Sequence, residues 1–309
     1  MENLIIKKSM RDAFGEALLE LGEKNPDIIV LTADLGPSIR LNNFAEKFSD
    51  RFINVGVAEA NMIGIAAGLA LEGMIPFCAS FAVFLPGRCF DQIRVSVCQN
   101  NANVKLVGSH CGLSNHGDGA SAQSVEDIAL ARVLPGMTVV CPADAFQTKK
   151  AVFEMAKKQG PMYLRLSRAE TPIITKEEDD FEIGKAQIIR EGRGATIVAC
   201  GSLLSEALLA AEELDAEVIN LHTIKPLDKE TILKSVQKTR RVVTLEEHSV
   251  YGGMGSAVAE LIAQEYPAPV KILGLQDSFG ESARSYDELL DKHGLNAENI
   301  IRIFKEDFR

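Results

Sequence analysis

The chain contains 309 residues, of which 46% are hydrophobic and 25% are charged, and its formal net charge at pH 7 is −10. This length and apolar content suffice for one large core or for two α/β cores of ordinary size, so the protein is expected to be globular. The acidic balance and the scattered Lys and Arg residues provide no basic face, so we exclude nucleic acid and anionic lipid as partners.

Helix and strand patterns alternate through the first half of the chain. Residues 9–22 have apolar positions at helical spacing, and residues 27–34 form a buried-strand run followed by the loop LGPSIR. A short helix, a strand over residues 51–56 and a helix that begins near Glu59 come next. Further strands are predicted in MIPFCAS, VKLVGSH, MTVVCPA and MYLRLS. This alternation is typical of a mostly parallel, doubly wound sheet.

Residues 169–184 interrupt the alternation with a proline and an acidic run, and we interpret them as a linker. After it, strands are predicted in AQIIRE, ATIVACG, AEVINLH, RRVVTLEEH and VKILGLQ, and two helical patterns end the chain. The predicted fold class is therefore α/β, with two doubly wound domains and mostly parallel sheets. The first domain comprises residues 1–168, and the second comprises residues 185–309.

The cysteines and the N-terminus bear on location. The six cysteines are widely spaced, form no CxxC pair and fall partly in strand-like runs, which favours buried free thiols in a reducing compartment. No segment approaches the roughly 20 apolar residues of a membrane span, and no targeting signal is recognisable. We therefore predict a cytoplasmic protein with no membrane partner.

The stretch RFINVGVAEANMIGIAAGLALEG, residues 51–73, is where the chemistry is expected. Glu59 opens an otherwise apolar helix and lies near the C-terminal end of a strand, where open α/β sheets bind ligands. The predicted buried stripe of this helix comprises Ile63, Ala66, Ala67, Ala70 and Leu71. Glu59 could simply be a solvated residue that complements the helix dipole. The apolar surroundings favour instead a desolvated carboxyl group that relays a proton to a ligand nitrogen.

Polar residues follow several strands of the first domain, although each of them could belong to an ordinary turn. Because the carboxyl ends of parallel strands meet at one edge of a sheet, we expect them to converge. The set comprises Arg11, Ser38, Arg40, His110, His116, Asp118 and Arg168. Guanidinium groups bind phosphate bidentately, so this composition suits a phosphorylated polyol.

Three aromatic residues, Phe81, Phe84 and Phe90, follow the strand MIPFCAS. Aromatic residues at this spacing are commonly core residues. Their position beside the strand that leads to Glu59 also suits a flat heterocycle stacked on Phe84.

Two glycine motifs need a separate interpretation. GDG at 117–119 begins like the thiamine diphosphate motif, but the window VVCPADAFQTKK lacks the Asn that would complete it. YGGMGSA at 251–257 lacks the G-x-G-x-x-G spacing of dinucleotide sites, so we interpret it as a turn into a tightly packed helix.

The chain resembles the transketolase family over its whole length. RFINVGVAEANM, PFCASFAVF, RCFDQIR, GSHCG, VEDIALARVLPGMTVVCPAD and LRLSR follow one another in family order, and INLHTIKPLD, EEHSVYGGMGSAVAE and DSFGES continue the likeness. The resemblance implies the C-terminal half of a transketolase, a pyrimidine-binding domain plus a C-terminal domain, encoded separately as in two-subunit transketolases.

The resemblance also implies roles for single residues. Glu59 matches the catalytic glutamate that hydrogen-bonds the aminopyrimidine ring of thiamine diphosphate, and Phe84, with Phe81 nearby, matches the aromatic residue under that ring. His110 matches a second catalytic residue, a histidine that contacts substrate hydroxyls near the reacting carbons. The implied substrate residues are Arg11, Ser38 and Arg168 for phosphate, His110, and Asp118 for a donor hydroxyl. No metal ligand is implied in this chain.

The run H-GDG-ASAQ departs from the family pattern GEDG. Ala122 stands where a His or Gln would help bind sugar or cofactor, and His116 is an extra histidine. Gln123 could take over the missing contact, or the enzyme could handle an unusual phosphorylated or sulfonated ketose.

The implied function is the transfer of a two-carbon ketol unit from a ketose phosphate to an aldose, as in the pentose phosphate pathway. The resemblance further implies an obligate partner, an N-terminal transketolase subunit that binds the diphosphate through Mg²⁺ or Ca²⁺, most simply in an α2β2 heterotetramer. The β chain of a 2-oxo acid dehydrogenase and a deoxyxylulose phosphate synthase-like enzyme are enzyme alternatives. They are disfavoured because a short 2-oxo acid has no distal phosphate for Arg11, Ser38 and Arg168. A non-catalytic regulatory half is the alternative of another class.

Overall fold

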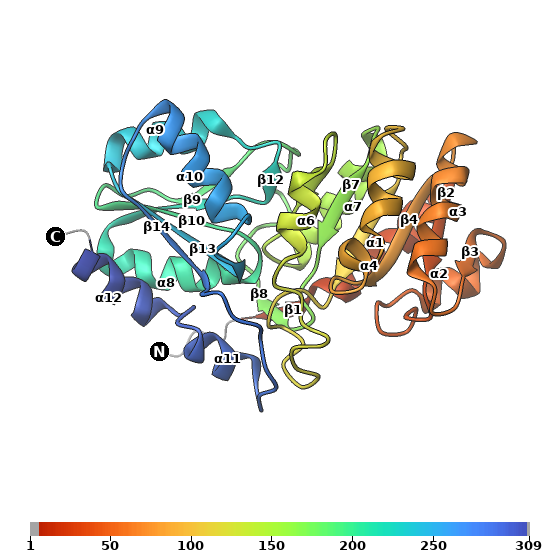
Figure 1. Cartoon of the computed structure of the whole chain (residues 1–309), viewed down its shortest axis with the longest axis horizontal. Helices are drawn as coiled ribbons and strands as arrows, with labels where there is room; N and C mark the ends of the chain where they lie inside the picture. The colour runs from red at the N-terminus through yellow and green to blue at the C-terminus, as the bar shows by residue number, and fades with distance from the viewer. Residues whose placement is uncertain (1–5, 308–309) are drawn as a thin grey trace.

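The computed structural model describes residues 6–307, so the outer limits predicted for the two domains, residues 1 and 309, lie outside the described residues. Two α/β domains lie side by side along the long axis of the molecule (Figure 1). Each has a mostly parallel sheet with helices on both faces, so the predicted fold class is confirmed.

The first domain is built on a seven-stranded sheet, all of whose neighbours are parallel except the last pair. In spatial order its strands are β3 (Phe52–Asn54), β2 (Ile28–Thr32), β4 (Ile75–Phe81), β5 (Lys105–Ser109), β7 (Met162–Arg165), β6 (Thr138–Val140) and β12 (Thr223–Lys225). Its helical segments are α1 (Met10–Lys24), α2 (Asn42–Lys47), η1 (Ser49–Arg51), α3 (Glu59–Leu71), α4 (Leu85–Arg88), α5 (Phe90–Gln92), η2 (Ile93–Cys98), α6 (Asp127–Val133) and α7 (Ala145–Lys157).

Alternation along the central strands explains why both faces of this sheet are covered. In β2, Ile28 and Val30 point to the side packed by α1 and α7, whereas Ile29 and Leu31 point to the side packed by α3 and α6. All five residues of β2 are buried, as expected for a parallel strand between two helical layers.

The second domain has a five-stranded sheet in which only β9 runs antiparallel to its neighbour. In spatial order the strands are β14 (Val270–Leu275), β13 (Val242–Ser249), β10 (Ala195–Ala199), β11 (Ala216–Asn220) and β9 (Gln187–Arg190). The helices are η3 (Gly201–Leu203), α8 (Leu204–Leu214), α9 (Lys229–Thr239), α10 (Met254–Glu265), α11 (Tyr286–Lys292) and α12 (Ala297–Asp307). α8, α11 and α12 pack on one face, and α9 and α10 pack on the other.

Two pairings tie the halves of the chain together in a way that the sequence patterns did not predict. β12, from the second half, joins the first sheet antiparallel to β6. β8 (Glu170–Pro172), inside the predicted linker, pairs antiparallel with β1 (Lys7–Ser9), and Ser9 then caps α1 by accepting a hydrogen bond from the backbone of Asp12. The N-terminus of α1 is thereby fixed beside the end of the first domain.

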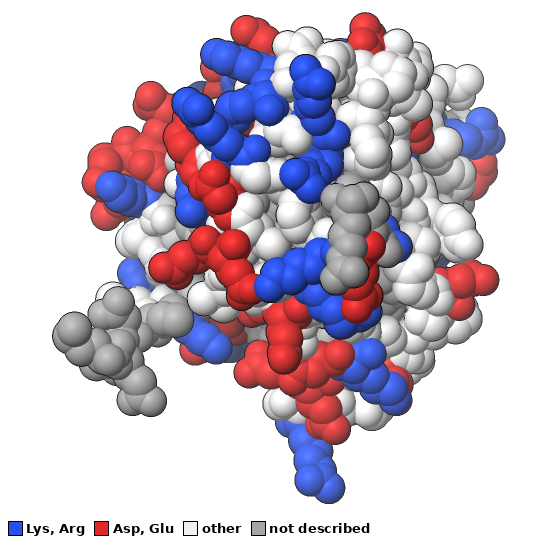
Figure 2. All heavy atoms as spheres, turned by 90° about the vertical axis from the view of Figure 1, so that its left-hand side faces the viewer, with Lys and Arg blue, Asp and Glu red and all other residues white. Residues whose placement is uncertain are grey.

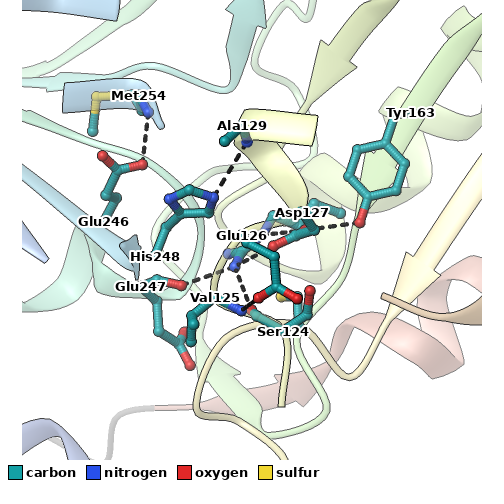
Figure 3. A network of polar contacts seen from close by, with 12 residues as sticks. Ser124, Val125, Glu126, Asp127, Ala129, Tyr163, Glu246, Glu247, His248 and Met254 are labelled. Atoms are coloured by element: carbon teal, nitrogen blue, oxygen red, sulfur yellow. Dashed lines mark hydrogen bonds and ion pairs between the residues drawn. The ribbon is translucent and has the colours of Figure 1, made fainter. Parts of the chain in front are cut away.

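A buried polar network joins the domains further (Figure 3). Arg165 of β7 forms an ion pair with Asp127 of α6 through Nε and Oδ2 at 2.8 Å, and the same oxygen accepts the Tyr163 hydroxyl at 2.8 Å. Arg165 Nη2 also donates to the main-chain oxygen of Glu247, in β13 of the second domain, at 2.8 Å. The Glu247 carboxylate accepts hydrogen bonds from Ser202 and Tyr286 at 2.9 and 2.7 Å.

The glycine-rich turn YGGMGSA receives a carboxylate of the protein itself. Glu246 accepts hydrogen bonds from the backbone N–H groups of Met254 and Gly255, both at 2.7 Å, at the start of α10. A Cβ at Gly255 would lie 2.5 Å from Thr244 Oγ1, so the close packing requires glycine. The interpretation of this motif as a turn into a tightly packed helix is confirmed, and α10 begins at Met254.

Figure 2 shows the end of the molecule formed by the second domain, where acidic and basic side chains occur on the same face. Among the described helices, none is both long and apolar enough to cross a membrane. All six cysteines are free, and five of them are buried.

Candidate active site

Glu59 is the first residue of α3, and its place is set by the turn that follows β3. Asn54 Oδ1 accepts hydrogen bonds from the backbones of Asp34 and Gly56, both at 3.0 Å, and Gly56 has a φ of 72°, which glycine adopts without strain. Glu59 is 5% exposed, so its carboxylate is buried as predicted rather than solvated. Of the predicted stripe of α3, Ile63, Ala66 and Ala67 are buried and Ala70 is partly buried. Leu71 is 68% exposed and does not belong to that stripe, because it lies at the last helical turn beyond the sheet.

A series of side-chain contacts, through Arg88 and two phenylalanine rings, connects Glu59 with His110. Arg88 Nη1 lies 3.2 Å from Glu59 Oε1, and the Arg88 guanidinium carbon lies 4.0 Å from the centre of the Phe84 ring. The Phe84 and Phe81 ring centres are 5.7 Å apart, and the Phe81 and His110 ring centres are 3.8 Å apart. Glu59, Phe81, Phe84 and His110, which the sequence singled out, therefore come together, and Arg88 joins them.

His110 is held in an unusual conformation just after β5. Its φ of 60° is in the left-handed region, and its Nδ1 lies 2.9 Å from the Ser109 hydroxyl. Burial, followed by the charges of Arg11, Arg168 and Arg40, lowers the pKa of His110 to about 3. The imidazole is therefore neutral near pH 7 and can both donate and accept a hydrogen bond.

Arg11 stands at the centre of the cationic part of this site. Its Nη1 donates to the main-chain oxygen of Ser38 at 2.9 Å, and its Nη2 donates to the main-chain oxygen of Arg168 at 3.2 Å. Burial, then Arg40 and Arg168, lowers the pKa of Arg11. Its Nε is buried and has no hydrogen-bond partner among the described residues 6–307. Arg11, Ser38 and Arg168 thus lie together as predicted, around a donor that an anionic ligand could satisfy.

The loop 110–124 is attached to the second domain rather than free. The main-chain oxygen of His116 accepts the Ala283 N–H at 2.9 Å, and the amide nitrogen of Gln123 donates to the main-chain oxygen of Glu281 at 3.0 Å. Gln123 is only 3% exposed, and its side chain is bonded to Glu281. This orientation does not support the expectation that Gln123 could replace the contact missing at Ala122.

Asp118 is exposed at the tip of this loop. Among residues 6–307, no hydrogen bond or ion pair connects Asp118 with Glu59, His110 or the arginines. Its loop is held by the contacts of His116 with Ala283, and the substrate role of Asp118 stays a prediction.

Arg88 is the residue that the sequence reasoning did not assign. Its signal was present in the motif RCFDQIR and in its spacing from Phe84, since residues four apart on a helix share a face. Arg40 was expected to converge with the other polar residues but was given no role of its own. Its Nε donates to Asp12 Oδ1 at 2.7 Å, which fixes it beside Arg11.

The donor set fits one end of a thiamine cofactor better than it fits a metal. A buried carboxylate beside an aromatic face can bind a flat, hydrogen-bonding heterocycle. In the part of the chain that the structure describes, no group of three His, Cys, Asp or Glu side chains could hold a metal ion. A groove of about 690 Å³ lies elsewhere, between α6, β12 and α10, and is lined by residues such as Arg132, Lys225 and Leu261.

Family models match both halves of the chain. The transketolase pyrimidine-binding domain matches residues 6–173, and the transketolase C-terminal domain matches residues 184–300. The chain belongs to the transketolase family. A pyrimidine-binding domain of this family implies dependence on thiamine diphosphate, and Glu59, Phe84 and Phe81 all lie within it.

Relatives of similar length are themselves subunits. The 6-deoxy-6-sulfo-D-fructose transketolase subunit SqwH of Clostridium sp. (strain MSTE9) is 44% identical, over 96% of this chain and 94% of the relative. A subunit of the apulose-4-phosphate transketolase of Phocaeicola vulgatus is 36% identical, over 94% of this chain and 95% of the relative. A solved split-gene transketolase, described as an inactive beta4 tetramer, has a TM-score of 0.87 and 44% identity, over 96% of this chain and 97% of that one. The chain is a C-terminal-type transketolase subunit.

Proposed function

We propose that this chain forms, with a separate diphosphate-binding subunit, a thiamine diphosphate-dependent transketolase. The complex moves a two-carbon ketol unit from a ketose with an anionic end to an aldose. The observation that carries the proposal is the alignment of buried Glu59, Phe84, Phe81 and neutral His110 next to the arginine cluster. A 2-oxo acid substrate would leave that cluster without a function.

Each residue has a distinct role in the proposed reaction. Glu59 hydrogen-bonds the aminopyrimidine ring and holds the proton at that ring nitrogen, and Phe84 supports the ring face. Thiamine diphosphate bound there would supply the nucleophilic carbon that the reaction of a ketose carbonyl requires. His110 hydrogen-bonds sugar hydroxyls near the reacting carbons, because its neutral ring can act as donor or acceptor. Arg11 and Arg168 hold the distal anionic group, which fixes the ketose for cleavage.

The substrate is proposed by class rather than by name. One relative is named for a sulfonated ketose and another for a sugar phosphate. Phosphate and sulfonate both present several oxygens to guanidinium groups, and Arg11 has an unpaired buried Nε. The family usually has a His or Gln where this chain has Ala122, so this side of the loop lacks a polar side chain. The sugar preference is therefore expected to differ from that of family members that retain the His or Gln.

The proposed partner is an N-terminal transketolase subunit that holds the diphosphate together with Mg²⁺ or Ca²⁺, in an α2β2 assembly. The complex is proposed to be cytoplasmic. The relative solved as an inactive tetramer of beta subunits supports the need for a second kind of chain.

The first test is activity of this chain alone and of this chain co-expressed with the product of its neighbouring gene, with thiamine diphosphate and Mg²⁺. Xylulose 5-phosphate, fructose 6-phosphate and 6-deoxy-6-sulfofructose serve as donors and ribose 5-phosphate as acceptor. We expect activity only in the mixture, with at least one anionic donor. Turnover of pyruvate instead of any ketose would contradict the proposal.

Glu59→Gln tests the assignment within the assembled complex. We expect kcat/KM to fall by roughly 100-fold or more because a positioned acid is removed, with the complex still formed. Glu72→Gln is the matched control, since Glu72 lies exposed just after the same helix and should leave kcat/KM unchanged. Equal turnover by Glu59→Gln and the wild type would instead support a non-catalytic half.

A further inference from the structure

The guanidinium group of Arg88 contacts both Glu59 and Phe84. Its Nη1 lies 3.2 and 3.3 Å from the two oxygens of the Glu59 carboxylate, and its central carbon lies 4.0 Å from the centre of the Phe84 ring. Phe84 and Arg88 are one helical turn apart at α4, so the side chain of Arg88 reaches back over the ring. Among the described residues, the guanidinium makes no other hydrogen bond or ion pair.

Glu59 and Phe84 are the two partners that the proposed function requires for the aminopyrimidine ring. A guanidinium group and an aminopyrimidine are both flat and conjugated, and both offer N–H donors at the edge of an N–C–N unit. Two such groups cannot hold the same carboxylate edge and the same aromatic neighbour at once. Arg88 therefore occupies the place that the aminopyrimidine ring would take.

We propose that Arg88 is a positioning residue that occupies the aminopyrimidine place in the cofactor-free chain and swings out when the cofactor enters. This inference rests on the proposed function. The Arg88 side chain is 52% exposed, so it can leave into solvent, whereas the Glu59 side chain is 6% exposed and stays in place. While Arg88 is present, it satisfies a buried carboxylate that would otherwise lack a partner.

The exchange has a consequence for affinity. The cofactor must displace Arg88 before its ring can reach Glu59 and Phe84, so the ion pair and the ring contact of Arg88 are lost on binding. Removing Arg88 removes this competitor for the site.

The test measures cofactor affinity and does not depend on turnover. The complex of this chain with its partner subunit is stripped of cofactor and titrated with thiamine diphosphate at fixed Mg²⁺ by calorimetry at pH 8. Arg88→Leu keeps an aliphatic stem on Phe84 but removes the guanidinium. Arg94→Leu is the matched control, because Arg94 is also 52% exposed and pairs with Asp91 at 2.8 Å, away from Glu59.

We expect Arg88→Leu to bind thiamine diphosphate about three- to ten-fold more tightly than the wild type at pH 8, the range expected for losing one half-exposed ion pair and one cation–π contact. Arg88→Lys, which keeps the charge but not the plane, should bind more tightly than the wild type and less tightly than Arg88→Leu. Arg94→Leu should match the wild type in affinity.

Two results overturn the inference in distinguishable ways. If the wild-type complex binds thiamine diphosphate and Arg88→Leu binds it equally or more weakly, Arg88 is not displaced and only this inference fails. If the wild-type complex binds no thiamine diphosphate at any pH, the proposed function fails, and the inference fails with it.

Discussion

Replacing Arg165 with methionine should destabilise the protein more than any surface change of the same kind. Arg165 and Asp127 are buried, with side chains 2% and 0% exposed, and they share two contacts at 2.8 and 3.1 Å. Arg165→Met leaves the Asp127 carboxylate buried with only the Tyr163 hydroxyl as a donor. It also removes the donor that the Glu247 main-chain oxygen uses across the domain boundary. Breaking such a pair costs roughly 3–5 kcal/mol of unfolding free energy.

The pH dependence of this loss identifies its cause. Burial alone would raise the pKa of Asp127, but the charge and hydrogen bonds of Arg165 outweigh burial and lower it. In the variant burial remains the largest influence and is opposed only by the smaller effects of His248 and the Tyr163 hydroxyl, so the pKa of Asp127 should lie above its usual value. The deficit relative to the wild type should therefore be full near pH 7 and should shrink as the pH falls toward 5 and Asp127 takes up a proton.

Urea unfolding followed by far-UV circular dichroism is the appropriate assay, because the chain contains no tryptophan for fluorescence. The double variant Asp127→Asn/Arg165→Met buries no charge and should recover at least about 2 kcal/mol of the loss. Arg302→Met, which breaks the exposed pair with Glu306, is the control and should cost under about 0.5 kcal/mol. A deficit below about 1 kcal/mol for Arg165→Met, or one that does not change with pH, would refute the reasoning.

Two further predictions concern packing and acid stability. Gly255→Ala places a Cβ 2.5 Å from Thr244 Oγ1 and 2.6 Å from Ile272 Cγ2, so we expect a loss of about 1–3 kcal/mol in urea unfolding. Gly64→Ala, in α3 with no atom within 4 Å of the added Cβ, should instead be neutral or stabilise by up to about 1 kcal/mol; equal effects of the two changes would contradict the packing argument. Burial lowers the pKa of His222 to about 4 from an ordinary value of 6.5, so the unfolded chain binds a proton between these values that the folded chain does not. Stability should thus fall by up to about 1.4 kcal/mol per unit as pH drops from 6.5 toward 4, and His222→Gln should flatten that part of the profile; an unchanged profile would show that His222 does not contribute.

The sequence predicted the elements that carry their own pattern. β2 and β4 are largely apolar runs, β5 has an apolar centre, and Glu59 stands out because it opens an apolar helix. β1, β8 and β12 have three residues each, too few to show a period, and they exist because of partners far along the chain. Such pairings are set by tertiary contacts that no local window contains.

The same limit applies within the site. Arg11, Ser38, His110 and Arg168 converge because each follows or precedes a strand at one edge of the sheet, which topology alone predicts. Asp118 has the same kind of position in the sequence. Its loop, however, is attached to the second domain by the hydrogen bond from the Ala283 N–H to the main-chain oxygen of His116. The contact of Arg88 with Glu59 depends on a side-chain rotamer, which the motif RCFDQIR does not reveal.

The electrostatic repulsion that lowers the stability of the ligand-free site also bears on its proposed substrate. Arg11 is held near Arg40 and Arg168, and these like charges, after burial, lower its pKa, while the same three arginines help to keep His110 neutral. In the ligand-free chain these groups repel one another and leave Arg11 Nε without a partner. A terminal phosphate or sulfonate would turn the repulsion into attraction and satisfy that donor, whereas a neutral sugar end would do neither. An arrangement that lowers stability without a ligand would thus favour the anionic substrate that we propose, held close to the neutral imidazole of His110.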